Sequence, residues 1–352
     1  MTINKPIIRI ALLALLLTTC AARAAQAPRN VILMIGDGMG VAQLTAGKIA
    51  AGELEMERIR TLGLMTTHSA NALVTDSAAA GTALATGHKT DNGVLAQTPD
   101  GKPLRTVLEA AEERGLKTGL VTSCSLTHAT PAAFGAHVPD RDRDVRIAEQ
   151  VAACGVDVLF GGGAKFFRAH FESMRGEGFT IVTTEEAWNV MGAPARAAAF
   201  LAEKHPPRIT EGRVPLEELT RRALLILEES GPGFFLMVEA SQIDWGGHAN
   251  DTEFILSEML DFDRAVGACL DFAESEGDTL VLVTSDHECG GMAVHDGSVE
   301  DRTVTECGYT TGYHTAVMVP LFAFGPGSEA FRGVLDNTEV GARLLEWAEG
   351  IR

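Results

Sequence analysis

The sequence predicts an α/β fold: a three-layer sandwich in which a central, mostly parallel sheet is covered by helices on both faces. Two observations support this prediction. Short apolar, β-branched runs recur along the chain, at 30–36, 118–123, 157–162, 233–239, 278–285 and 319–325. Helical patterns separate most of these runs. Strands that alternate with helices form parallel pairs buried on both faces, and such strands have continuous apolar stretches.

The helical segments have recognisable ends or faces. Residues 103–115 begin with proline and end with glycine, as helices often do. Residues 215–231 and 251–277 are long and amphipathic. Residues 163–215 fit the alternation less well, because small residues, prolines and charges are mixed there. We therefore expect one catalytic domain over 25–352 with a surface insertion around 163–215.

Residues 1–24 have the pattern of a secretory signal peptide. Lys5 and Arg9 form a basic start, and the apolar run "IALLALLL" follows. Ala22 and Ala24 fit an A-x-A cleavage pattern, and the run is too short to span a bilayer. We expect an exported protein, periplasmic or extracellular, with no membrane span. The alternative is a lipoprotein signal in which Cys20 is acylated.

The composition excludes some partners. A net charge of −18 argues against binding to nucleic acid or to anionic membranes. An acidic protein that acts on an anionic substrate needs local positive charge, which metal ions can supply. Because exported proteins can form disulfides, we expect Cys289 to pair with Cys307, while Cys269 lies in a helical pattern and is expected in the core.

Polar side chains follow the predicted strands. In parallel sheets the carboxyl ends of the strands meet at one edge, where ligands bind. The residues expected at this edge are Asp37, His128, Thr130, Glu239, Asp244, His248, Asp286, His287 and His314. Each has an ordinary alternative, such as a helix cap for an aspartate or a packed position for a histidine. Together, carboxylates and imidazoles indicate zinc, and carboxylates with a hydroxyl indicate magnesium.

The other histidines are assigned no role. They are expected to be ordinary packed or surface residues. These are His68, His88, His137, His170, His205 and His295.

Ser77, in "VTDSAAAGTALATG", is a candidate nucleophile. A serine hydroxyl is a weak nucleophile at neutral pH, but a bound zinc ion lowers the pKa of an oxygen ligand. The alternative is a capped Ala/Gly helix in the core. A phosphate would also need a cationic clamp, and Arg141, Arg143 and Arg146 all follow the Thr130 segment. Periodicity does not choose among these arginines.

Six blocks resemble the alkaline phosphatase family. They are "NVILMIGDGMG", "VTDSAAAGTALATGHKTDNG", "THATPAAFGAHVPDR", "VEASQIDWGGHAND", "VTSDHECGG" and "YHTAVMVPLFAFGPG", and they follow the family's order. The resemblance implies hydrolysis of small phosphomonoesters of broad range through a phosphoserine, with an alkaline optimum. It also implies two zinc ions, a third metal ion and a homodimer.

The resemblance also implies a role for each matching residue. Ser77 matches the nucleophile, Arg141 the phosphate clamp, and Asp76 the residue that orients the arginine. The remaining matches are metal ligands. The first zinc site matches Asp244, His248 and His314, the second Asp37, Asp286 and His287, and the third, usually magnesium, Asp37, Thr130 and Glu239.

Two positions depart from the family pattern. His128 stands where members often have an acidic residue, so zinc could replace magnesium in the third site. Trp245 stands where some members have a basic residue, which predicts weaker phosphate binding and faster product release.

Other functions are less consistent with the residues. One alternative is a phosphodiesterase or sulfatase of the same superfamily. The sulfatase pattern C/S-x-P-x-R is absent from "DSAAAG", and Ser77 together with Arg141 favours monoesters. A non-catalytic protein that binds zinc or phosphate is a further alternative, and the complete set of ligands argues against it.

Overall fold

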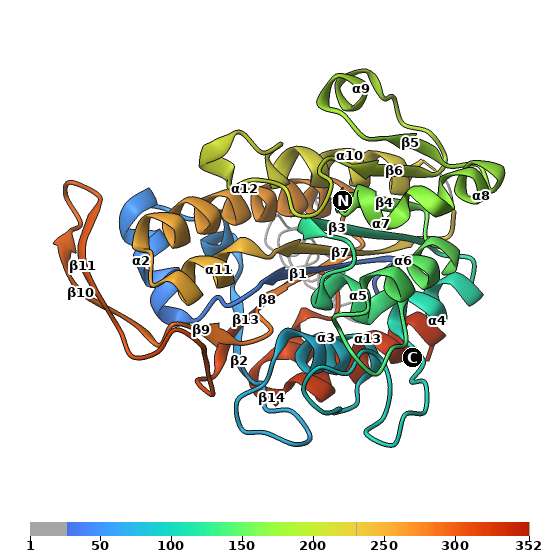
Figure 1. Ribbon diagram of the computed structural model, residues 1–352. Coiled ribbons are helices and arrows are strands. Elements are labelled where there is room, and N and C mark those ends of the chain that lie inside the picture. Colours follow the sequence, from blue (N-terminus) through green and yellow to red (C-terminus); the bar gives the residue numbers. More distant parts are fainter. Residues whose placement is uncertain (1–26, 230, 352) are drawn as a thin grey trace, which may run out of the picture.

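The computed structural model, which describes residues 27–229 and 231–351, contains a ten-stranded sheet (Figure 1). The predicted signal peptide, with Cys20, lies outside the described residues. The strand order is β14-β2-β13-β8-β1-β7-β3-β4-β6-β5. The bounds are β1 Asn30–Gly36, β2 Thr61–Thr66, β3 Lys117–Ser125, β4 Val158–Gly162, β5 Thr180–Val182, β6 Ala197–Phe200, β7 Phe234–Ala240, β8 Thr279–Thr284, β13 Val319–Phe324 and β14 Gly333–Asp336.

The sheet is mostly parallel, as predicted. The central strand β1 pairs in parallel with β7 and β8, and β3 pairs in parallel with β7 and β4. Within the described sheet, β13 runs antiparallel to both β8 and β2. All six apolar runs of the sequence correspond to strands of this sheet.

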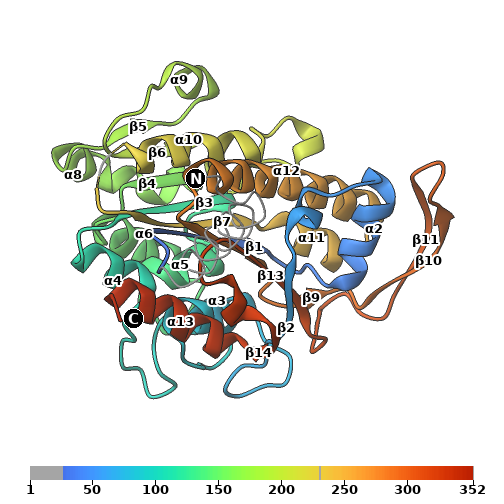
Figure 2. The ribbon, with the colours of Figure 1, turned by 180° about the vertical axis from the view of Figure 1, so that it is seen from behind.

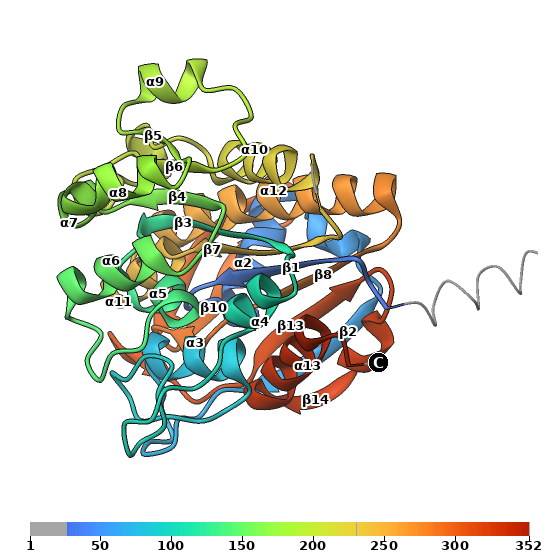
Figure 3. The same cartoon turned by 90° about the vertical axis from the view of Figure 1, so that its right-hand side faces the viewer.

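Helices cover both faces of the sheet, as Figure 3 shows from the side. One layer contains α3 Ser77–Thr86, α4 Val107–Glu113, α5 Ala129–Gly135, α6 Asp144–Ala153 and α13 Asn337–Glu349. The other contains α2 Val41–Ala51, α10 Leu216–Glu228, α11 Gln242–Ala249 and α12 Thr252–Glu276. Alternate residues of β1 enter different cores: Leu33 and Ile35 pack on the α3 side, and Ile32 and Met34 on the α12 side. The predicted three-layer sandwich is confirmed.

Two predicted segments differ from the structure. The helix expected over 103–115 begins at Val107, because Thr106 caps it and forms a capping box with Glu109. Pro103 instead forms an isolated bridge with Gln97. The segment 163–215 is not a simple surface insertion, since its strands β5 and β6 extend the main sheet and β6 is fully buried. Its helices are α7 Ala164–Phe167, α8 Phe171–Gly176 and α9 Glu185–Val190.

A hairpin projects from the body of the molecule (Figures 1 and 2). It consists of β10 Met292–Ser298 and β11 Thr303–Tyr309, and the short pair β9 Glu288–Cys289 and β12 His314–Thr315 lies at its base. The predicted disulfide is wrong, because Cys289 and Cys307 are both free. Cys289 is buried against Gly247, while Cys307 lies in the hairpin opposite Val294. None of the described helices combines the length and apolarity needed to cross a bilayer.

Candidate active site

The predicted polar residues gather at the carboxyl ends of neighbouring parallel strands. Asp37 directly follows β1, Glu239 lies near the end of β7, and Asp286 and His287 follow β8. The three strands are adjacent in the sheet, so their ends bring these side chains to one edge. All four side chains are fully buried. Burying several carboxylates together is costly unless cations compensate them.

Ser77 is the first residue of α3 and lies at this edge. Asp76 caps the helix by accepting a hydrogen bond from the Ala79 backbone N–H at 3.0 Å. The helix is buried along its whole length, and its small residues allow close packing against α5 and α13. Ser77 Oγ lies 3.3 Å from His287 Nε2. Residues 77–86 thus form the capped, buried Ala/Gly helix that was predicted as the alternative. The Ser77 side chain at the start of this helix also lies among the polar residues.

Asp244, His248 and His314 form the first polar group. The Nε2 atoms of the two histidines lie 3.2 Å apart, and Asp244 oxygens lie 3.3 Å and 3.5 Å from them. The Nδ1 atoms of His248 and His314 lie 2.8 Å from the carbonyls of Gly312 and Thr75. Donation from Nδ1 leaves each Nε2 lone pair free for a metal. The four ligand atoms around a tetrahedral zinc ion lie about 3.3 Å from one another. The distances among the ligand atoms of Asp244, His248 and His314 match this spacing.

Asp37, Asp286 and His287 form the second group. His287 Nε2 lies 3.5 Å from Asp37 Oδ1 and 3.2 Å from Asp286 Oδ2. Burial, together with the neighbouring carboxylate of Asp286, raises the pKa of Asp37 well above its usual range, and burial raises the pKa of Asp286 to about 6. Burial lowers the pKa of His287 to about 4, so its imidazole is neutral near pH 7. Neutral imidazole is the form that binds a metal.

Glu239, His128 and Cys124 lie in a third group, and Thr130 lies close enough to Glu239 to lower the pKa of its carboxyl, against the larger effect of burial. A ligand atom each from Glu239, His128 and Cys124 lies within 4.8 Å of the others. Glu239 Oε2 accepts a hydrogen bond from Thr122 Oγ1 at 2.5 Å, and burial raises the Glu239 pKa to about 7. Burial and nearby Arg141 lower the pKa of His128 to about 3. The imidazole of His128 is thus neutral.

Many polar atoms of the three groups are buried and have no hydrogen-bond partner among the described residues. Buried polar atoms are normally hydrogen-bonded, so a set of orphans at one place indicates a missing ligand. These atoms are both carboxylate oxygens of Asp37, Oγ1 of Thr130, Oε1 of Glu239, Oδ1 of Asp244, Oδ2 of Asp286, and Nδ1 of His128 and His287. The donors are oxygen and nitrogen atoms, which suit zinc and magnesium. The residues therefore fit divalent metal ions.

The structure distinguishes the three candidate arginines. Arg141 Nη1 donates to Asp76 Oδ2 at 3.0 Å, and its Nη2 lies 3.4 Å from His128 Nε2. Arg143 and Arg146 instead pair with the exposed carboxylates of neighbouring acidic residues, 3.9 Å and 2.6 Å away. Arg141 is therefore the arginine that lies beside Ser77's helix.

The alkaline phosphatase family model matches residues 28–178 and 208–300. The chain belongs to the alkaline phosphatase family. It is 31% identical to alkaline phosphatase 3 of Bacillus subtilis, over 90% of this chain and 88% of that protein. It is also 36% identical to streptomycin-6-phosphate phosphatase of Streptomyces griseus, over 92% of this chain and 91% of that protein. This alkaline phosphatase is thus a phosphoric monoester hydrolase.

Solved structures of alkaline phosphatases share this fold. Alkaline phosphatase from the Antarctic bacterium TAB5 superposes with a TM-score of 0.85 at 35% identity, covering 92% of this chain and 99% of that one. A variant of the TAB5 enzyme, solved with Mg bound in its M3 site, gives a TM-score of 0.83 at 35% identity with the same coverage. The enzyme family is metal-dependent, consistent with the orphaned donors described above.

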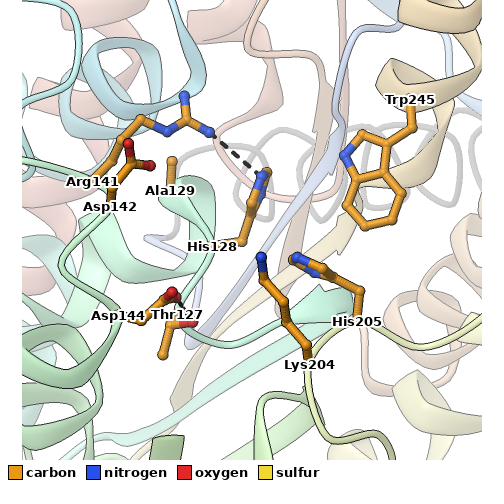
Figure 4. Close-up of a pocket in the computed structure, with 9 residues that line it drawn as sticks. All are labelled: Thr127, His128, Ala129, Arg141, Asp142, Asp144, Lys204, His205 and Trp245. Atoms are coloured by element: carbon orange, nitrogen blue, oxygen red, sulfur yellow. Dashed lines mark hydrogen bonds between the residues drawn. The ribbon is translucent and has the colours of Figure 1, made fainter.

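A pocket of about 630 Å³ opens beside Arg141 in this alkaline phosphatase (Figure 4). It is lined by Thr127, His128, Ala129, Arg141, Asp142, Asp144, Lys204, His205 and Trp245. The rings of His128, His205 and Trp245 meet edge to face, with centroids 4.9–6.1 Å apart.

Sequence reasoning missed four residues near the site, among them Cys124 of the third group. Lys204 and His205 come from the connection after β6, and no motif marks them. Cys289 Sγ lies within 4.8 Å of the ligand atoms of Asp244, His248 and His314. The signal that could have found Cys289 is its place two residues after His287 in "SDHEC".

Proposed function

We propose that this alkaline phosphatase hydrolyses phosphomonoesters of broad range through a phosphoserine at Ser77, with an alkaline optimum. The observation that carries the proposal is the position of Ser77 Oγ, 3.3 Å from His287 Nε2 and at the start of the helix that Asp76 caps. Ser77 therefore lies beside both the second polar group and the Asp76–Arg141 pair. A nucleophile beside both a metal-type group and a cationic clamp suits phosphoryl transfer.

Three metal sites complete the proposed centre. Asp244, His248 and His314 would hold one zinc ion. Asp37, Asp286 and His287 would hold the other. When bound, these ions would supply Lewis-acid stabilisation to the attacking and leaving oxygens of an in-line displacement.

The third site would use Asp37, Thr130 and Glu239, with His128 beside it. Oxygen donors favour Mg²⁺, and the imidazole of His128 favours Zn²⁺. The magnesium-bound variant of the TAB5 enzyme supports a third site of this kind. We propose magnesium as the usual occupant and zinc as the alternative.

The chain's own residues orient the substrate. The guanidinium of Arg141 would bind two phosphate oxygens through its planar fork. The Asp76 carboxylate fixes that guanidinium at 3.0 Å while it caps α3. The backbone N–H groups of the first turn of α3 also favour the negative charge of the phosphate. Ser77 would lose its hydroxyl proton to solvent and its Oγ would form a bond to phosphorus as the bond from phosphorus to the leaving oxygen breaks, and that oxygen would take a proton from solvent. Water would later attack phosphorus and break its bond to Ser77 Oγ, which releases phosphate and returns the proton to Ser77.

The cellular location, domain organisation and oligomeric state of the enzyme are also proposed. We propose that it is exported, with residues 1–24 as its signal peptide and 25–352 as a single catalytic domain. We further propose that it forms a homodimer. Size measurement of the purified mature protein tests the dimer, and N-terminal analysis of the exported protein tests the cleavage.

Trapping of the phosphoenzyme tests the nucleophile. The variant Ser77→Ala should lose all acid-stable label from radioactive phosphate and at least about a thousandfold in kcat, because the residue that forms the covalent bond is gone. Metal analysis should show unchanged zinc and magnesium content. The surface variant Ser173→Ala is the matched control and should keep both label and activity. Label at another residue of Ser77→Ala would refute the assignment.

A further inference from the structure

Lys204 lines the pocket beside the site without an ion-pair partner. It lies in the connection that follows β6, and no acceptor among the described residues lies within hydrogen-bonding distance of its ammonium group. In Figure 4 its side chain ends between His128 and His205.

The backbone that carries Lys204 is fixed from several sides. The N–H groups of Gly163 and Ala164 donate to the Ala202 carbonyl at 3.0 Å, and the Lys165 N–H donates to the Glu203 carbonyl at 3.1 Å. A Cβ atom added to Gly162 would lie 2.2 Å from the Lys204 carbonyl oxygen, so β4 packs directly on this segment. The backbone position of Lys204 is therefore set by the fold.

His205 is fixed by the same segment. Its Nδ1 accepts a hydrogen bond from the Ser125 N–H at 3.2 Å, at the end of β3. The family model leaves residues 179–207 unmatched, so Lys204 and His205 lie in a part of this chain that the general family pattern does not describe.

The pocket is larger than a phosphate group needs. Its volume of about 630 Å³ is within the range of pockets that hold whole small molecules. Arg141 lies on one side of His128, and Lys204 lies on the other (Figure 4). The Asp142 carboxylate lies beside Arg141, and the Asp144 carboxylate lies beside Thr127, whose hydroxyl donates to it. The wall formed by Lys204, His205 and Trp245 thus presents one cation and two rings.

We propose that Lys204 is a specificity-determining residue that binds a second anionic group on the leaving group of the substrate. This inference rests on the proposed function. When Arg141 binds the reacting phosphate, Lys204 lies on the opposite side of His128 and is the cation that remains to bind the second anionic group. The preferred substrates are then phosphomonoesters whose leaving group carries a carboxylate or a further phosphate.

A matched pair of substrates tests this assignment. We compare kcat/KM for 4-carboxyphenyl phosphate with kcat/KM for phenyl phosphate, in wild type and in Lys204→Gln. Because Lys204 is exposed, the ratio should fall about three- to fivefold in the variant. Lys165→Gln is the control, since Lys165 lies close by, over the Phe166 ring at 4.5 Å, and outside the pocket lining. Its ratio should equal that of wild type.

Salt gives a second measurement in the unmodified enzyme. Screening should lower the wild-type ratio as ionic strength rises from about 0.01 M to about 1 M, and the Lys204→Gln ratio should change less. A ratio of the two kcat/KM values that is unchanged by Lys204→Gln would overturn the proposal. An equal loss of kcat/KM for both substrates is one such result, and it would mean that Lys204 acts on the reacting phosphate. Failure of the phosphoserine mechanism would instead appear as missing label on Ser77, whatever the ratio.

Discussion

Asp76 shows how one side chain can serve two purposes. One carboxylate oxygen accepts from the Ala79 N–H and caps the helix that begins at Ser77. The other accepts from Arg141 and from the Gly93 N–H, each at 3.0 Å. The charge matters for the arginine, whereas the cap needs only an oxygen acceptor. The two purposes can therefore be separated by substitution.

Asp76→Asn should keep the cap and lose the ion pair, whereas Asp76→Ala should lose both. We expect phosphate to inhibit both variants about tenfold less than wild type, because Arg141 is no longer held at the site. Asp76→Ala should lose about 1 kcal/mol more unfolding free energy than Asp76→Asn, which keeps the cap although its amide NH2 no longer accepts from the Gly93 N–H. Phosphate inhibition and urea unfolding measure the two effects. Equal loss of stability in both variants would contradict this division.

Several site residues could be predicted because they follow apolar strands. Asp37, Glu239 and Asp286 stand at the ends of buried runs, so the rule for parallel sheets places them at one edge. Lys204 and His205 could not be found this way. Their approach to His128 depends on the packing of residues 202–206 against β4, and no local pattern encodes that contact.

At the scale of elements, strands were predicted where apolar runs were long. The edge strands β5 and β14, and β2 beside β14, are short or partly exposed, so they lack a continuous apolar run. Strand β6, "AAAF", is fully buried, but alanine is a weak indicator of strands. The segment 163–215, which was expected to be a surface insertion, thus contains two strands of the main sheet that the sequence did not predict.

The contact between α13 and α3 positions Ser77's helix, as Figure 2 shows from behind. A Cβ atom added to Gly341 of α13 would lie 2.1 Å from the Ala83 carbonyl oxygen and 2.8 Å from the Gly87 nitrogen. These are backbone atoms, which cannot move aside without shifting α3. The close approach of the two helices therefore requires glycine at this position.

Gly341→Ala should lower the free energy of unfolding by about 1–3 kcal/mol, because overpacking forces the two helices apart. Urea unfolding measures the loss. Gly176→Ala is the control: no atom lies within 4 Å of its added Cβ, so stability should stay equal or rise slightly. If Gly341→Ala were as stable as wild type, the contact would not constrain α3.

At the scale of the whole molecule, the sheet brings an acidic chain's carboxylates together in its interior. The net charge is −18, and Asp37, Glu239 and Asp286 are fully buried at one edge. Protons or metal ions must compensate these groups. Stability, metal content and pH are therefore linked.

Removal of metal should make stability fall as pH rises from about 6.5 to about 8. The pKa of Glu239 is about 7 when folded, above its unfolded value near 4.3, so its stabilising proton is lost across this range. The pKa of His248, raised to about 9 by its hydrogen bond with Asp244, acts in the same direction. Histidines with lowered pKa, such as His287 at about 4, act in the opposite direction, but only below about pH 6.5.

Urea unfolding of chelated enzyme at several pH values measures this dependence. The control is the same protein reloaded with zinc and magnesium, in which metal ions replace the protons and the decline should disappear. The loaded enzyme should also unfold at higher urea concentration than the chelated one at pH 8, because metal binds the folded state. Chelated enzyme that grew more stable between pH 6.5 and 8 would show that the buried carboxylates are compensated by something other than protons and metal.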